Sequence, residues 1–114
     1  MVVAVCRLEL SIPSANSLKA KRMVLRSVLD RVRARYHVSI VEVGEQDVWQ
    51  RASVGFAIVT TDRALANSLA DQVTRTIGGA RDCLIQDRAL EILSLGSTIR
   101  DLVPAPRSDG EDGP

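Results

Sequence analysis

The chain has 114 residues, of which 46% are hydrophobic and 25% are charged, and its formal net charge is +1. This length fits one domain and leaves no room for a second, and such a domain can bury roughly 65% of the surface that its unfolded chain exposes. Apolar runs stay well short of the roughly 20 residues that a membrane-spanning helix needs, so we expect a cytoplasmic protein with no membrane partner.

The two cysteines, Cys6 and Cys83, lie far apart in the sequence. Neither belongs to a C-x-x-C pair or to a Cys/His ligand cluster, so the sequence indicates neither zinc binding nor thioredoxin-like chemistry. We predict that both are buried, reduced thiols.

The first predicted element is a strand over residues 2–12. Its apolar residues alternate with Arg7, Glu9 and Ser11, which is the period of a strand with one buried face. We expect the buried face to hold Ala4, Cys6, Leu8 and Leu10. The opposite face would then expose Val3, Val5, Arg7 and Glu9.

A helix follows this strand. Pro13 ends the strand, Asn16 or Ser17 can cap the helix, and apolar residues recur at helical spacing from Leu18 to Tyr36. Residues 17–35 carry seven Lys or Arg residues against one acid, and the rest of the chain has no comparable basic run.

The basic residues of this helix are the main functional signal. Lys19, Lys21 and Arg22 lie in its first turns, where each cation costs about 0.3–1 kcal/mol against the helix dipole. A bound phosphate would reverse that penalty, because free backbone N–H groups and cations would both contact it. Lys19, Arg22, Arg26 and Arg33 also share one side of the helix, at about 100° per residue. We predict nucleic-acid contact through Lys19, Lys21, Arg22, Arg26 and Arg33, and the alternative is a solvated face whose long side chains cover apolar surface.

Two β-rich runs, residues 37–43 and 52–61, are separated by a turn-like segment and predict a hairpin. Three acids near the turn lack the ligand number and glycine placement of a calcium loop, so we predict no metal site. Trp49 either caps the edge of the core or anchors an interface.

The second run contains G-F-A-I-V, residues 55–59, which is close to part of the RNA-recognition-motif consensus. That motif stacks bases on aromatic side chains of the exposed sheet face. In this chain Ile58 replaces the second aromatic residue of the consensus, and Val54 replaces its leading cation. We therefore predict that Phe56 belongs to the core and that the sheet does not stack bases.

Asp62 can cap a second helix that ends at Gly78 and Gly79, and a last strand is expected over residues 84–95. A short helical segment is predicted for residues 98–103, and a disordered acidic Pro/Gly tail for residues 104–114. The acids of this tail could also compete with an anionic ligand of the first helix.

The order β-α-β-β-α-β predicts an α+β, ferredoxin-like domain over residues 1–103, with two helices on one face of a four-stranded antiparallel sheet. The other face stays open and carries small apolar residues at one end. We predict an interface there, with Val3, Val5, Val59 and Trp49, through which the protein could form a homodimer.

The segments S-L-K-A-K-R (17–22), V-S-I-V-E-V (38–43), D-V-W-Q-R-A (47–52) and G-F-A-I-V-T (55–60) give the chain a resemblance to the YlxP-like bacterial proteins, a domain of unknown function. The resemblance covers residues 1–95 and implies a ferredoxin-like fold. It also implies a gene neighbourhood of translation and ribosome maturation factors. It implies no catalytic residue, since the family has no established active site.

We find no signature of a catalytic site or a cofactor. His37, the single histidine, has no nucleophile at a recognisable spacing, and the chain has no glycine-rich phosphate loop. We therefore expect a small non-enzymatic, RNA-associated accessory protein that acts on ribosomal RNA or in ribosome maturation. The alternative is a homo-oligomeric protein-interaction module that does not bind nucleic acid directly.

Overall fold

The structure is a computed structural model and describes residues 1–96. The predictions for residues 98–103 and for the tail 104–114 lie outside the described residues. The elements follow one another as β1 (Val2–Ser11), α1 (Leu18–Arg35), β2 (Ser39–Gly44), β3 (Arg51–Thr60), α2 (Arg63–Gly78) and β4 (Leu84–Ser94).

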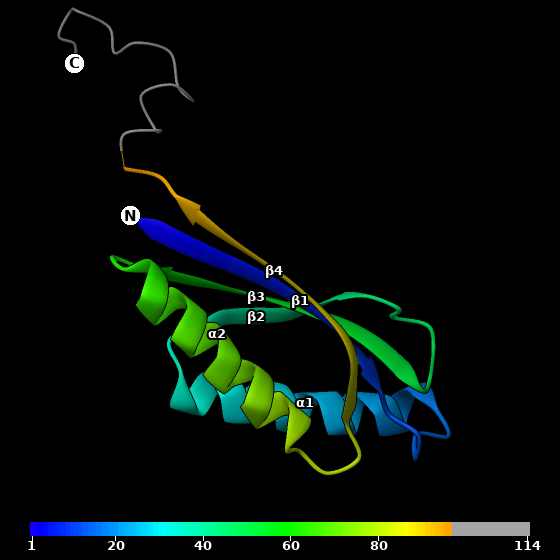
Figure 1. The fold of residues 1–114 in the computed structure, drawn as a ribbon. Coiled ribbons are helices and arrows are strands. Elements are labelled where there is room, and N and C mark those ends of the chain that lie inside the picture. Colours follow the sequence, from blue (N-terminus) through cyan, green and yellow to red (C-terminus); the bar gives the residue numbers. More distant parts are fainter. Residues whose placement is uncertain (97–114) are drawn as a thin grey trace, which may run out of the picture.

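The four strands form one sheet in the order β2-β3-β1-β4, and each neighbouring pair is antiparallel. Both helices lie on the same side of this sheet (Figure 1). This is the predicted ferredoxin-like arrangement, and the prediction is confirmed.

A polar side chain caps the N-terminus of each helix. Ser17 caps α1, since its hydroxyl accepts a hydrogen bond from the Ala20 N–H at 3.0 Å. The Asp62 carboxylate caps α2 in the same way and accepts from the Leu65 N–H at 3.1 Å. Each cap satisfies a backbone donor that the first helical turn leaves free, which explains why both helices start where the sequence predicts.

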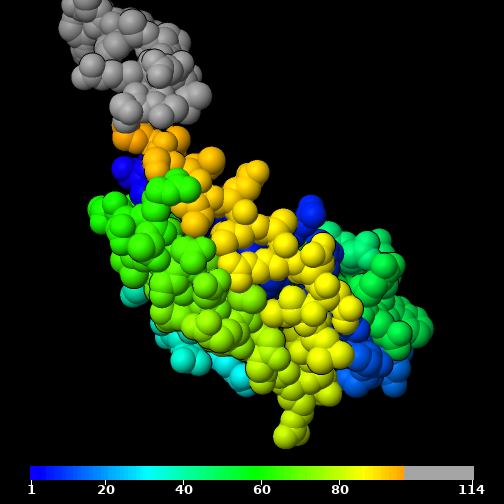
Figure 2. Space-filling model, viewed as in Figure 1, coloured from blue at the N-terminus to red at the C-terminus, as the bar shows by residue number. Residues whose placement is uncertain are grey.

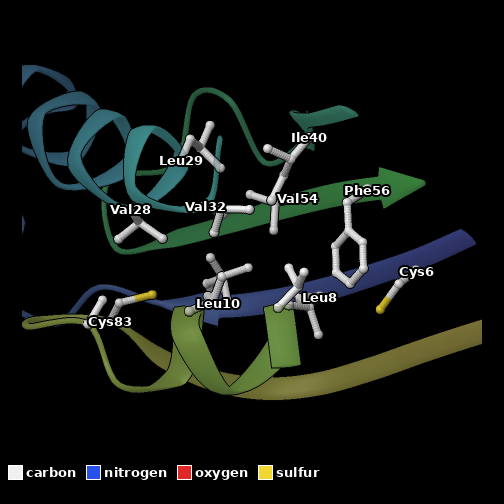
Figure 3. Close-up of a cluster of buried hydrophobic side chains, with 14 of the residues drawn as sticks. Cys6, Leu8, Leu10, Val28, Leu29, Val32, Ile40, Val54, Phe56 and Cys83 are labelled. Atoms are coloured by element: carbon white, nitrogen blue, oxygen red, sulfur yellow. The ribbon is translucent and has the colours of Figure 1, made fainter. Parts of the chain in front are cut away.

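The core lies between the helices and the sheet (Figure 3). Leu8 and Leu10 of β1 face it, together with Val54 and Phe56 of β3, and all four are buried. The alternation predicted for β1 is therefore confirmed, and β3 alternates in the same way. Phe56 is a core residue, and its ring is not available to stack a base.

The register of β1 and β3 decides what the other side of the sheet carries. Val3 pairs with Val59, Val5 with Ala57, and Arg7 with Gly55. These residues point away from the helices, so one end of the open face is apolar and its centre is charged.

Tyr36 links the two helices by polar contacts. The hydroxyl of Tyr36, the residue that ends α1, lies 2.8 Å from the Thr76 hydroxyl of α2. This hydrogen bond holds the C-terminal half of α2 against the end of α1.

Candidate nucleic-acid interface

The prediction for Lys21 is wrong. Lys21 was predicted to contact nucleic acid, but its side chain is 1% exposed. Its ammonium donates hydrogen bonds to the backbone carbonyls of Glu45 and Val48, the latter at 2.7 Å. The Glu42 carboxylate lies 3.1 Å from the same nitrogen, as an ion pair rather than an aligned hydrogen bond. Lys21 therefore holds the β2–β3 connection against α1 and is not available to a phosphate.

The sequence contained a signal for this role that our reading missed. Lys21 lies at helical spacing within the apolar stripe of α1, three residues after Leu18 and four before Leu25. A lysine in such a position must either reach out of the interface or find acceptors inside it. The acceptors come from residues 42–48, which no local pattern links to the helix.

The remaining cations of the described chain fall into two groups. One group has protein partners: Arg7 with Glu9, Arg51 with Glu45, Arg88 with Asp71, Arg33 with Asp30, and Arg63 with the Ile92 carbonyl. The other group makes no ion pair or side-chain hydrogen bond within residues 1–96. It comprises Lys19, Arg22, Arg26, Arg31, Arg35, Arg75 and Arg81.

The unpaired cations of this group are confined to the helices and to the connection after α2. Each cation on a strand, by contrast, has a carboxylate partner. The helical carboxylates are already engaged, because Asp30 and Asp71 form ion pairs and Asp62 caps α2. The helical layer therefore carries unneutralised positive charge. Figure 2 shows part of this layer, with α2 in green and α1 in cyan below it.

Three of these cations form what we call the α1 ridge: Lys19, Arg22 and Arg26. All three are exposed on one side of α1, and none has a partner in the described part of the chain. Arg33 belongs to the same side but is partly engaged, since it donates to the Ile40 carbonyl at 2.6 Å and pairs with Asp30 at 3.5 Å. The predicted basic surface is thus present on α1 without Lys21, and with Arg33 at its margin.

A second group of arginines was not predicted from the sequence. Arg31 and Arg35 on the other side of α1 face Arg75 of α2 across an open pocket of about 450 Å³, which we call the arginine pocket. The spacing of Arg31 and Arg35 was visible in the sequence as an i, i+4 pair. Arg75 is remote in sequence, and only the packing of the helices brings it to the pocket.

The predicted interface residues do not form one surface. Val3, Val5 and Val59 lie together at one end of the open face, with Val59 67% exposed and Val5 38% exposed. Trp49 is 51% exposed, but it precedes the opposite end of β3, roughly 27 Å away at about 3.4 Å per residue from Arg51 to Val59. Val41, Val43 and Leu93, which were not predicted, add exposed apolar surface to the face.

Both cysteines are buried and free, as predicted. Burial raises the pKa of Cys83 above its ordinary value of 9.0. Burial also raises the pKa of Cys6, and the nearby Arg88 guanidinium opposes this effect only in part. Both groups are therefore poor nucleophiles at neutral pH.

Within residues 1–96, no three His, Cys, Asp or Glu side chains are placed so that they could share a metal ion. The helices of this part of the chain are also too short or too polar to cross a membrane.

Comparison with known proteins bears on the family and on the fold. A family model described as "Protein of unknown function (DUF503)" matches residues 3–89. The chain is 51% identical over 55 residues to "Uncharacterized protein YlxP" of Bacillus subtilis (strain 168), and this match covers 48% of the chain and 60% of the relative. It also resembles the solution NMR structure of a de novo designed protein with a ferredoxin fold, with a TM-score of 0.52 and 15% identity. That likeness covers 85% of this chain and 90% of the designed one, and it supports the fold alone.

Proposed function

The chain belongs to the family described as "Protein of unknown function (DUF503)", and we propose from its surface that it is a small RNA-associated accessory protein. One observation carries the proposal. The unpaired cations of the described chain lie on α1, on α2 and in the connection after α2, and the carboxylates of the two helices are already engaged.

Such a layer attracts polyanions even when the net charge of the chain is close to zero. The formal net charge is only +1, but a phosphate backbone responds to the local potential of the surface that it approaches. The α1 ridge adds the free N–H groups at the start of α1, which also favour a phosphate. Ribosomal RNA is the appropriate first probe, because the YlxP-like resemblance implies a neighbourhood of translation genes.

Contacts of this kind position an RNA chain without reading its sequence. If three to five phosphates are neutralised, the logarithm of the binding constant should fall against the logarithm of the salt concentration with a slope of roughly −2 to −4.5. The interaction should therefore be modest at physiological salt, as suits an accessory factor that acts beside other components.

The test is binding of fluorescently labelled ribosomal RNA fragments, measured by anisotropy over a salt series. The double variant Arg22→Gln/Arg26→Gln should lose most of the affinity and reduce the slope by about 2. The matched control is Gln46→Glu/Gln86→Glu, which changes the net charge by the same amount at two exposed positions outside the helices. Equal losses in both variants, or no salt-dependent binding by the wild-type protein, would contradict the proposal.

A second candidate function is self-association through the open face of the sheet. The observation that favours it is the exposed apolar group at one end of this face, to which Val5, Val59 and Leu93 belong. Arg7 of this face already pairs with Glu9 of the same chain at 3.1 Å, so the apolar group supplies the contact with a second copy related by a two-fold axis. The face is therefore suited to a second copy of the same chain.

Light scattering coupled to size-exclusion chromatography tests this candidate. The wild-type protein should be a dimer at micromolar concentration, and Val59→Glu should convert it to a monomer. Leu65→Glu is the matched control, because Leu65 is a similarly exposed apolar residue on α2. A wild-type protein that stays monomeric at the highest attainable concentration would rule the candidate out.

A further inference from the structure

The arginine pocket lies between the C-terminal halves of α1 and α2. Its volume is about 450 Å³, within the range of about 300–1,000 Å³ that is typical of small-ligand sites. Its lining comprises Arg31, Arg35, Tyr36, Gln72, Arg75, Thr76 and Gly79. The pocket is on the opposite side of α1 from the α1 ridge, so the two basic features are separate surfaces.

The charge of the lining is entirely positive. Three guanidinium groups contribute to it, and no carboxylate does. Arg31 and Arg75 make no ion pair or side-chain hydrogen bond within residues 1–96, and the Arg35 guanidinium lies over the Tyr36 ring at 5.6 Å from its centre. Mutual repulsion of three cations around one hollow is relieved when an anion enters it.

The floor of the pocket is fixed from both helices. Tyr36 and Thr76 are joined by their hydroxyl groups at 2.8 Å, and the Tyr36 hydroxyl also donates to the Gln72 carbonyl at 3.4 Å. This contact holds α1 and α2 together where the arginines converge. The floor of the site is therefore formed before a ligand arrives, which lowers the entropic cost of binding.

We propose that the arginine pocket binds a phosphomonoester, either at the end of an RNA chain or on a free mononucleotide. A phosphomonoester carries a charge of about −1.5 to −2 at pH 7 and three acceptor oxygens, whereas an internal phosphodiester carries about −1. Arginine forks suit such oxygens because each can donate two parallel hydrogen bonds. The pocket volume of about 450 Å³ leaves room for more than a phosphate, and Gln72 and Thr76 also line it.

Arginines near helix C-termini also have a purely structural use, since they offset the negative end of the helix dipole. This use makes a different prediction from ligand binding. If the arginines only offset the helix dipole, the protein should not respond to a phosphomonoester. The proposed site should instead bind a nucleotide in preference to its nucleoside. The inference rests on the proposed function only for the RNA form of the ligand.

The first experiment is a titration of the full ¹⁵N-labelled protein with inorganic phosphate, AMP and adenosine, followed by backbone amide shifts. AMP and phosphate should shift the amides of Tyr36 and Gly79, and adenosine should not. Arg31→Gln and Arg75→Gln should each weaken AMP binding about tenfold. Arg22→Gln, on the α1 ridge, should leave it unchanged. No shift with millimolar AMP, an equal response to adenosine, or unchanged AMP binding in both pocket variants would overturn the proposal.

The second experiment identifies the source of the phosphate and separates this inference from the proposed function. RNA oligonucleotides of one sequence, with a 5′-phosphate or a 5′-hydroxyl, are compared by anisotropy. Preference for the phosphorylated chain, lost in Arg75→Gln but kept in Arg22→Gln/Arg26→Gln, assigns the site to an RNA end. If both oligonucleotides bind equally well and AMP still shifts the backbone amides, the site is supported and is assigned to free phosphomonoesters. If RNA fails to bind while AMP shifts persist, the proposed function fails and the pocket stands.

Discussion

The strands and the helices of this molecule differ in how their cations are paired. On the sheet, Arg7, Arg51 and Arg88 each lie within 3.3 Å of a carboxylate. On the helical layer, Arg22, Arg26 and Arg31 have no partner in the described part of the chain. A surface cation that is paired with a carboxylate is already neutralised. Unpaired cations that lie close together repel one another, and a bound anion relieves this repulsion. The pairing of the cations, more than their number, therefore points to the binding surface.

α1 contains the same contrast within two residues. Lys19 and Lys21 are both lysines in its first turns, yet one is exposed and the other is buried and bonded to the β2–β3 connection. Position relative to the apolar stripe decides between the two roles.

The largest effect is expected for Lys21→Met. The substitution keeps the apolar stem but leaves Glu42 and two backbone carbonyls without their donor, which should cost about 2–4 kcal/mol of unfolding free energy. Urea denaturation measures it. Lys19→Met is the control and should change stability by less than about 0.5 kcal/mol. Similar stability of the two variants would mean that Lys21 does not hold the connection.

The next effect compares the two faces of β3. Val54 is 0% exposed under the helices, and Val59 is 67% exposed on the open face. Val54→Ala should lower the unfolding free energy by about 2 kcal/mol, because buried methyl groups are lost and a cavity remains. Val59→Ala should cost less than about 0.5 kcal/mol in the monomer. Thermal unfolding at low protein concentration gives both values, and a large loss for Val59→Ala would place Val59 in an interface.

A smaller effect is expected for Tyr36→Phe. The substitution removes the hydroxyl that links α1 to α2 and leaves the ring in place, so the unfolding free energy should fall by about 1 kcal/mol. Chemical denaturation checks this value. AMP binding should also weaken, since the floor of the arginine pocket loses its fixed geometry. Unchanged AMP binding would show that the Tyr36–Thr76 bond supports the fold alone.

The smallest effect concerns pH. Burial raises the pKa of Cys6 and Cys83 in the folded protein, so the unfolded chain releases these protons first as the pH rises. Their contribution to stability is complete below the ordinary value of 9.0 and is lost as the pH rises toward the folded values. Unfolding of the wild type and of Cys6→Ala/Cys83→Ala between pH 7 and about 10.5 should show a weaker pH dependence in the variant. Identical dependence would mean that other groups cause it.

Much of the fold was predictable because its signals are local. The alternation along β1 identified the buried side chains of Leu8 and Leu10, and the polar residues Ser17 and Asp62 identified both helix starts. Part of the candidate site was predictable for the same reason, since Lys19, Arg22 and Arg26 share one side of a single helix. The role of Lys21 was predicted wrongly, because a count of charges does not say which of them the core encloses.

The order of elements, the faces of the strands and the basic character of α1 could be inferred from the sequence, because each depends on spacing within one segment. The contacts of Lys21 with residues 42–48, and the position of Arg75 opposite Arg31 and Arg35, were seen only in the folded structure. Both outcomes need residues that are remote in the chain to meet. Periodicity states which face of a helix is apolar, but the partner of that face depends on how the packed sheet and helices bring distant segments together.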